Sequence, residues 1–306
     1  MTSPHCRKPN QLLQKQGEDM RYRLSPNGNF SKQLKRLMRS INEDIALALL
    51  RACRDPETGV HEARKSCKEI RALLRLVRPQ LGKAEFQHRQ AFYKSISAKL
   101  SGNRDAMVRE KTWQNLVAET PAIQSSTFEV VGQFLSRQQK LDPIDEKGRD
   151  FFLDLALEVE SESDAPKNWK LPKSLSDLIP NLKRIYQKTR DAQQKAENSD
   201  DIADFHRFRK RSKDLFYCMK VLRPMFGKSL KNKLSNLEAL TELQGLANDQ
   251  AVLLAYLSEH RQEIDLDDAD WELVQESIMD KLEGLQKHSH AVAKKLLADS
   301  PGPFIK

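Results

Sequence analysis

The chain of 306 residues carries a formal net charge of +9 and contains four cysteines. A chain of this length buries enough apolar surface to fold without disulfide or metal staples. Its net charge favours an anionic partner, although charge alone does not distinguish nucleic acid, a membrane surface and a small polyanion. The cysteines show no CxxC spacing, which argues against a thiolate metal centre and is typical of reduced thiols in the cytosol.

The N-terminal residues 1–28 are polar and contain Pro and Gly, and we interpret them as a loose leader. This segment has no apolar core of signal-peptide length. The longest apolar run in the chain, IALALL at 45–50, is far too short to cross a bilayer. We therefore expect a cytoplasmic protein with no membrane partner.

The remaining chain is expected to be all-α, because Gly and Pro are sparse and lie between long segments with a 3.6-residue apolar period. In chain order, the first predicted helices span 31–54, 58–78, 84–100, 104–118, 122–139 and 144–163. The stretch SESDAPKNWKLPKS at 161–174 is the best candidate linker. The later predicted helices span 174–197, 201–222, 229–258 and 267–298. The sequence thus predicts two helical halves, at 29–163 and 174–300, with no strand.

Two segments of the chain repeat each other. VHEARKSCKEIRALLRLVRPQLG at 60–82 aligns without a gap with FHRFRKRSKDLFYCMKVLRPMFG at 205–227, which pairs His61 with His206. Near their ends, both copies have an Arg-Pro dipeptide and, three residues after the proline, a Gly. This internal repeat places one copy in each predicted half.

Each copy of the repeat places cations on one face of a helix and apolar side chains on the other. Residues 61–78 carry a net charge of +4 and residues 205–223 carry +6, so the rest of the chain is nearly balanced. The cationic face of the first copy consists of His61, Arg64, Lys65, Lys68, Arg71 and Arg75. The cationic face of the second copy consists of His206, Arg209, Lys210, Lys213 and Lys220.

A basic stripe opposite an apolar stripe is most often a solvated helix face. Like charges three or four residues apart on a helix repel by a few tenths of a kcal/mol per pair. Because both copies keep at least five such residues on one face, we favour a bound anion that compensates this repulsion. Duplication of an ancestral helix without a shared function is the alternative.

A second pair of similar elements follows the basic helices, SGNRDAMV at 101–108 and GLANDQAVL at 245–253. Both place small or polar residues before an acid, Asp105 or Asp249. The first interpretation is a helix N-terminus, where a carboxylate accepts a hydrogen bond from an unpaired backbone N–H. The alternative is that these acids orient basic side chains.

The H-x-x-R/K-K-x-x-K pattern, its duplication and the Asp elements together resemble the CHAD family, the conserved histidine α-helical domain, over roughly residues 30–298. The resemblance implies an all-α fold of two four-helix-bundle-like halves related by pseudo-twofold symmetry. It also implies that the basic helices face a shared central cavity. Members of the family bind inorganic polyphosphate. We therefore expect this ligand as the partner and an association with polyphosphate granules.

The resemblance nominates both cationic faces as polyphosphate ligands. By similarity, the preceding helices add Lys32, Lys35, Arg36 and Arg39 in the first half, and Lys183, Arg184, Lys188 and Arg190 in the second. A helix rises about 1.5 Å per residue, so the stripe from His61 to Arg75 is a rod of positive charge roughly 20 Å long. A linear polyanion fits such a rod, because Arg and Lys both hold phosphate oxygens.

The leading hypothesis is a non-catalytic polyphosphate-binding module with no cofactor and no metal site. The chain has no HD dipeptide, HExxH motif, P-loop or pair of carboxylates on one helix face, so no enzyme is predicted. A nucleic-acid-binding helical protein is the first alternative, in which Phe216 and Tyr217 stack bases. A histidine phosphotransfer protein is the second, with His61 or His206 as the phosphoryl acceptor. The oligomeric state is not predicted.

Overall fold

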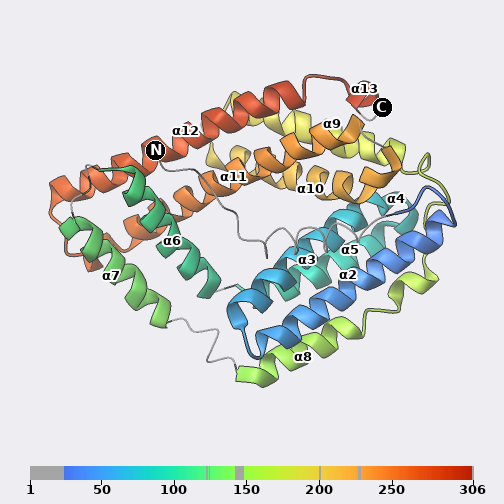
Figure 1. Ribbon diagram of the computed structural model, residues 1–306, viewed down its shortest axis with the longest axis horizontal. Coiled ribbons are helices and arrows are strands. Elements are labelled where there is room, and N and C mark those ends of the chain that lie inside the picture. Colours follow the sequence, from blue (N-terminus) through green and yellow to red (C-terminus); the bar gives the residue numbers. More distant parts are fainter. Residues whose placement is uncertain are drawn as a thin grey trace, which may run out of the picture.

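The protein is represented by a computed structural model, in which the described residues are helical apart from short connections and contain no strand (Figure 1). The predicted all-α class is confirmed. The described residues are 24–101, 103–121, 123, 125–141, 148–199, 201–226 and 229–304.

The first bundle consists of α2 (Phe30–Ala52), α3 (Pro56–Leu76), α5 (Lys83–Lys99) and α8 (Gly148–Glu160). The buried side chain of Asn42 joins three of these helices. Its amide nitrogen donates hydrogen bonds to the Val159 carbonyl at 2.7 Å and to Ser163 Oγ at 2.9 Å, and its oxygen accepts one from the Tyr93 hydroxyl at 2.8 Å. A fully satisfied polar group of this kind fixes how the helices are aligned.

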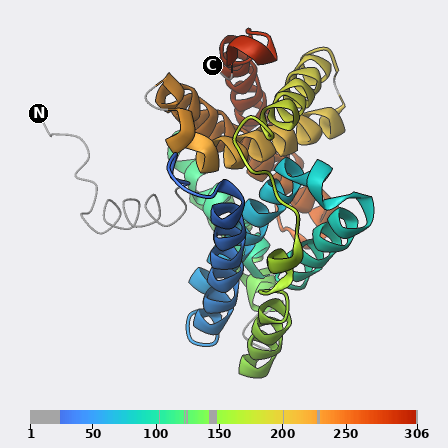
Figure 2. The same ribbon diagram turned by 90° about the vertical axis from the view of Figure 1, so that its right-hand side faces the viewer.

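The second bundle consists of α9 (Ile179–Glu197), α10 (Ile202–Phe226), α11 (Ser229–Glu259) and α12 (Asp268–Leu296). It lies above the first bundle in Figure 1 and also in the rotated view of Figure 2. One apolar core runs through the two bundles. At their contact, the buried Cys218 thiol of α10 lies 3.5 Å from the Ala72 carbonyl of α3. Each bundle holds one copy of the repeat, whereas the pseudo-twofold relation of the halves stays a prediction.

The helices α6 (Asn103–Glu119) and α7 (Ser125–Leu141) form a hairpin that packs against the ends of α11 and α12. Trp113 and Phe134 from the hairpin share a second core with Leu253 of α11 and Val274 of α12. A segment assigned by sequence to the first half therefore builds a core with the second half. The domain boundary at 161–174 stays a prediction.

The start of α9 differs from the predicted one. The predicted helix begins at residue 174, but α9 begins at Ile179. The backbone N–H groups of Lys173 and Ser174 donate hydrogen bonds to Asp177 Oδ2 at 3.0 and 3.1 Å, which stabilises a turn instead of a helix. The predicted linker contains the short 3₁₀ helix η2 (Ala165–Asn168).

The two Arg-Pro dipeptides of the repeat have different structures. The first copy breaks after Leu76, and Pro79 lies in the first turn of α4 (Arg78–Leu81), where its missing N–H costs no helical hydrogen bond. In the second copy α10 continues through Pro224 to its end at Phe226, so the predicted end at residue 222 is wrong. A proline in the last turn interrupts little of the helix beyond it.

Among the helices described, none is long and apolar enough to span a membrane. Cys53, Cys67 and Cys218 are free thiols, and burial raises the pKa of Cys67 to about 12. Cys6 and most of the predicted leader lie outside the described residues. Leu24, which falls within the predicted leader, is already buried in the core.

Gly59 permits a close approach of α2 and α3. A Cβ atom at this position would lie 2.4 Å from the Ala52 backbone nitrogen and 2.6 Å from the Ala48 carbonyl oxygen. We predict that Gly59→Ala lowers the free energy of unfolding by about 1–3 kcal/mol, because the backbones must move apart. Chemical denaturation measures the change.

The control is Gly284→Ala on α12, where an added Cβ meets nothing within 4 Å. It should raise the free energy of unfolding by about 0.5–1 kcal/mol through helix propensity. Equal effects of the two substitutions would contradict the close helix contact at Gly59.

Candidate functional site

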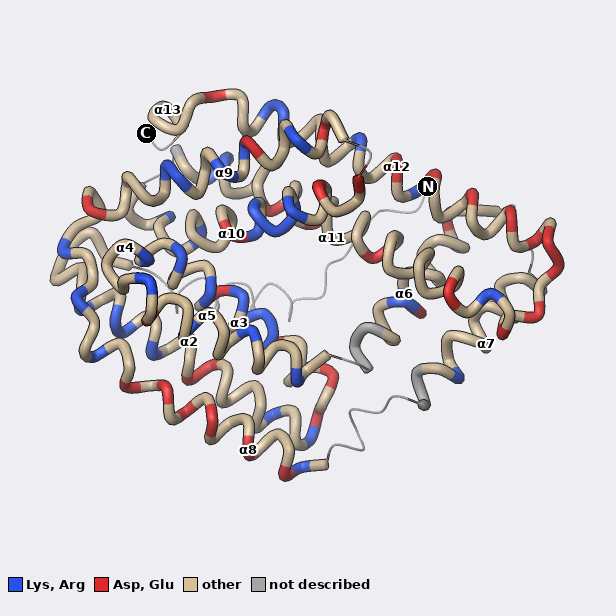
Figure 3. The backbone as a smooth tube through the Cα atoms, turned by 180° about the vertical axis from the view of Figure 1, so that it is seen from behind, with Lys and Arg blue, Asp and Glu red and all other residues tan. Residues whose placement is uncertain are grey.

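A pocket of about 490 Å³ lies between α3, α10 and α11, and we call it the large pocket. Six Lys or Arg side chains line it, and Asp214 is the acid among the lining residues. The lining comprises Lys68, Arg71 and Arg75 from α3, His206, Arg209, Lys210, Lys213, Asp214 and Tyr217 from α10, and Asn248 and Val252 from α11. Figure 3 marks the Lys and Arg positions along α3 and α10.

Local sequence features orient α3. Asp55 caps the helix by accepting a hydrogen bond from the Thr58 N–H at 3.1 Å, and Pro56 occupies the first turn. Burial of Ile70 and Leu73 fixes which face packs into the core. Cations three, four and seven residues apart are then left together on the opposite face, toward α10.

Two ion pairs join the basic helices across their contact. Arg75 Nη1 of α3 lies 2.9 Å from Asp214 Oδ1 of α10, and Lys220 Nζ of α10 lies 3.8 Å from Glu69 Oε1 of α3. In the repeat alignment Arg75 corresponds to Lys220, and Glu69 corresponds to Asp214. Each copy therefore supplies the acid that neutralises a cation of the other copy, as expected for two helices that cross about a local twofold axis. We call these contacts the cross-pairs.

Burial disfavours the charged forms of several side chains in the large pocket. Burial lowers the pKa of Arg209. The pKa of Lys210 is lowered by burial and then by the charge of the nearby Arg75. Burial raises the pKa of Asp214, whereas the charge of Arg75 acts to lower it. Arg209 Nε is buried without a hydrogen-bond partner in the described part of the chain. An unsatisfied buried donor costs about 1–3 kcal/mol, so an anion oxygen in this pocket would relieve that cost.

Sequence comparison matches residues 32–258 to the CHAD domain. This chain belongs to the CHAD domain family. PptA from Streptomyces chartreusis has a similar structure, with a TM-score of 0.61 and 13% identity, over 89% of this chain and 100% of PptA. The CHAD domain from the plant Ricinus communis gives a TM-score of 0.53 and 16% identity, over 90% of this chain and 93% of that one. At these identities the likeness shows the fold alone. No curated protein sequence matches the chain.

The structure of this CHAD domain separates the predicted cations into groups. It brings seven of them into the large pocket, namely Lys68, Arg71, Arg75, His206, Arg209, Lys210 and Lys213. Arg184 and Lys188 line a second pocket together with Arg75. The candidates that line neither pocket are His61, Arg64, Lys65, Lys220, Lys32, Lys35, Arg36, Arg39, Lys183 and Arg190. For the residues of all three groups, ligand binding stays a prediction.

Several candidates outside the pockets make structural contacts in this CHAD domain. Arg64 Nη1 donates a hydrogen bond to the Leu100 carbonyl at 2.9 Å, which ties α3 to the end of α5. Lys35 Nζ donates one to the Lys167 carbonyl at 2.7 Å. A basic side chain on a sequence stripe can thus satisfy a backbone carbonyl instead of facing a ligand.

For Asp249, the first of the two interpretations of the element at 245–253, a helix N-terminus, is wrong. The element lies inside α11, which runs unbroken from Ser229 to Glu259. Packing of this long helix against α10 and α12 offsets the cost of Gly245, which is about 1 kcal/mol relative to Ala. The charge of Asp249 acts to raise the pKa of Arg209, against the lowering by burial. This supports the alternative that the acid acts on a basic side chain. The side chains of Arg104 and Asp105 lie outside the described residues.

Some residues of the large pocket escaped the sequence analysis. Asp214 had a usable signal, since it occupies the repeat position of Glu69 and is the acid of the second copy of the repeat. Asn248 and Val252 lie in the repeated element at 245–253, but the sequence did not indicate that they line a pocket, because the face that α11 turns toward the pocket depends on tertiary packing. Within the described residues, no three or more His, Cys, Asp or Glu side chains gather as a metal site would require.

We predict that Asp214→Asn destabilises the protein more than Glu69→Gln does. The Arg75 and Asp214 side chains are only 17% and 10% exposed, so removal of the carboxylate charge leaves a buried cation without its partner. The expected loss of unfolding free energy is about 1–3 kcal/mol for Asp214→Asn. It is below about 1 kcal/mol for Glu69→Gln, because Lys220 is farther from its acid.

Urea denaturation near neutral pH compares the two variants. The exposed Asp280→Asn on α12 is the charge-matched control and should change stability by less than about 0.5 kcal/mol. A loss for Asp214→Asn no larger than for this control would show that the cross-pair does not stabilise the contact of the bundles.

Proposed function

We propose that this CHAD domain binds inorganic polyphosphate in the large pocket and catalyses no reaction. One observation carries the proposal: Lys and Arg side chains from both copies of the repeat line a single pocket. Family membership supports the proposal, because CHAD family members bind inorganic polyphosphate. Association with polyphosphate granules in the cytoplasm follows from it as an expectation.

The spacing of the cations favours a linear polyanion over a single phosphate. Lys68 and Arg75 are seven residues apart, which corresponds to about 10 Å along α3. One phosphate group reaches only part of this row, whereas a chain presents an oxyanion at every unit. Arg supplies a planar fork of donors and Lys a mobile point charge, so the mixed lining tolerates a chain that shifts its register.

The alternatives fit the pocket less well. A volume of 490 Å³ is that of a cube about 8 Å on each edge, which is too small to admit a DNA duplex, whose major groove alone is roughly 12 Å wide. Tyr217 lines the pocket but Phe216 does not, so the expected base-stacking pair is divided. His206 lines the pocket and His61 does not, which leaves a phosphotransfer protein without two equivalent acceptor sites.

Charge reversal on opposite walls of the large pocket tests the proposal. We predict that Lys68→Glu on α3 and Lys213→Glu on α10 each weaken binding of long-chain polyphosphate about tenfold or more, because one attraction becomes a repulsion. Lys65→Glu is the matched control, with the same charge change on α3 at a residue outside the pocket lining. Isothermal titration calorimetry measures the affinities. Equal losses for all three variants would indicate attraction by net charge alone and would overturn the proposed site.

Competition with duplex DNA separates this function from general nucleic-acid binding. All polyanions release counterions, so salt dependence alone does not distinguish them. We predict that duplex DNA at equal phosphate concentration does not displace labelled polyphosphate, because its backbone cannot enter the large pocket. Displacement by duplex DNA would favour a nucleic-acid-binding protein instead.

The position of His206 predicts a pH dependence of binding. Burial, and then the Arg209 charge, hold the pKa of His206 below its usual 6.5, so the side chain is neutral near pH 7 without ligand. A neighbouring phosphate favours the protonated form and raises this pKa, so binding takes up a proton. Affinity should therefore increase as pH falls from about 8 to about 6.

Titration calorimetry across this pH range should show that His206→Gln removes most of the increase. The matched control His61→Gln, at a residue outside the pocket lining, should keep it. An unchanged slope in the His206 variant would mean that this histidine does not take up a proton when the ligand binds.

A further inference from the structure

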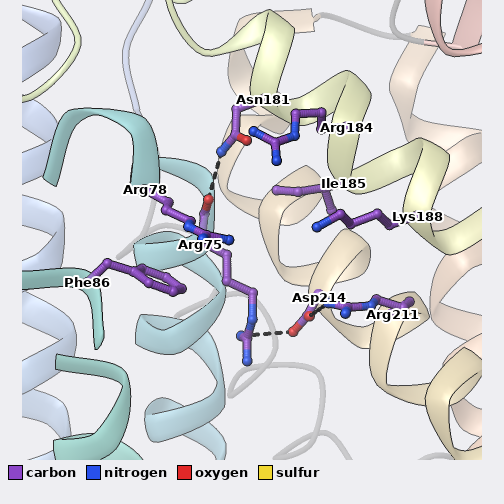
Figure 4. A pocket seen from close by; sticks show the side chains of 9 residues that line it. All are labelled: Arg75, Arg78, Phe86, Asn181, Arg184, Ile185, Lys188, Arg211 and Asp214. Atoms are coloured by element: carbon purple, nitrogen blue, oxygen red, sulfur yellow. Dashed lines mark hydrogen bonds and ion pairs between the residues drawn. The ribbon is translucent and has the colours of Figure 1, made fainter. Parts of the chain in front are cut away.

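A second pocket of about 150 Å³ lies between α3, α4, α9 and α10, and we call it the small pocket. Arg75 and Asp214 line both pockets, so the ion pair between them forms a shared wall. The other cations of the small pocket are Arg78, Arg184, Lys188 and Arg211. Figure 4 shows Arg78 on one side of this space and Arg184 and Lys188 on the α9 side.

Contacts between elements fix the walls of the small pocket. The buried Asn181 at the start of α9 donates hydrogen bonds to the carbonyls of Arg75 and Leu76, both at 2.7 Å. These bonds satisfy carbonyls at the end of α3 and hold α9 against it. The guanidinium of Arg78 lies over the Phe86 ring, 4.9 Å from its centroid. The cations are thus mounted on elements whose relative position is set before any ligand binds.

The cations of the small pocket act on one another. The pKa of Lys188 is lowered by partial desolvation and then by the charges of Arg211, Arg184 and Arg78. These residues come from three separate elements, α4, α9 and α10, so their mutual repulsion is not a property of one helix face. Five cations against one carboxylate leave the small pocket strongly electropositive. Phosphate oxygens would compensate this charge.

The carboxylate of Asp214 already occupies a position between cations. Its Oδ1 pairs with Arg75, while its buried Oδ2 accepts no hydrogen bond from the described residues and lies 3.6 Å from Arg211 Nη1. A phosphate oxygen offers the same negative charge to both guanidinium groups. A polyanion that extends from one pocket to the other must therefore compete with Asp214 for Arg75.

We propose that the small pocket is a second phosphate subsite, and that the Arg75–Asp214 ion pair is a latch that a long polyanion opens to occupy both pockets. This inference rests on the proposed binding of polyphosphate. A short chain fills the large pocket and leaves the latch closed. A longer chain replaces the carboxylate partner of Arg75 with phosphate and gains the small-pocket cations as an intramolecular second contact.

Titration calorimetry with tripolyphosphate and with long-chain polyphosphate tests the subsite. The small-pocket variant is Arg184→Gln with Lys188→Gln, two exposed residues of α9. The matched control is Lys94→Gln with Lys287→Gln, which removes the same charge from exposed positions outside both pockets. The small-pocket variant should bind the long chain about tenfold more weakly, and this loss should exceed its loss for tripolyphosphate by about threefold or more. A loss equal to that of the control would overturn the subsite.

A double-mutant cycle with Asp214→Asn tests the latch. Asp214→Asn should strengthen long-chain binding in the otherwise unchanged protein, because Arg75 no longer has to leave a carboxylate. In the small-pocket variant this gain should shrink to the gain seen with tripolyphosphate. Additive effects would contradict a latch, because residues that act through one shared contact are coupled.

Two further controls separate the possible failures. Thermal denaturation establishes that each variant is folded at the titration temperature, and the α9 variant tests the subsite even if Asp214→Asn does not fold. If the unsubstituted protein fails to bind long-chain polyphosphate, both the proposed function and this inference are wrong. If binding is sensitive to Lys68→Glu but not to the small-pocket substitutions, only this inference is wrong.

Discussion

The two cross-pairs at the contact of α3 and α10 are the interaction on which the rest of the structure depends. Two strongly basic helices placed face to face repel each other, and a lining of Lys and Arg alone would drive the bundles apart. Glu69 and Asp214 each neutralise a cation of the opposite helix within a largely buried contact. A basic pocket can therefore persist between the bundles before any anion is bound.

The same arrangement stabilises the contact of the bundles but lowers the affinity for an anion. Asp214 holds the bundles together through Arg75, and it also lines both pockets as a buried negative charge. A carboxylate in this position resembles the oxyanion that the site is proposed to bind, so it competes for the same guanidinium group. Such competition disfavours small anions, which gain few contacts in return, and favours ligands long enough to recover the cost elsewhere.

Sequence reasoning succeeded where the information is local and failed where it is tertiary. The 3.6-residue period and the aligned repeat predicted the helices and the cationic faces that meet at Lys68 and Lys213. They could not show that Arg64 bonds to a carbonyl of α5, since that contact depends on how the helices pack. Arg78 belongs to the Arg-Pro dipeptide near the end of the first copy, and the sequence did not indicate that it lines the small pocket. Arg211 also lines the small pocket, but the repeat does not single it out, since Ser66 stands at the equivalent position of the first copy.

The most direct test of the account is a crystal structure of the protein with long-chain polyphosphate. The account predicts phosphate density in the large pocket, with an oxygen within hydrogen-bond distance of the buried Arg209 Nε. Phosphate groups ordered only along the outer cations of α2, such as Lys32 and Arg36, with an empty large pocket, would contradict it.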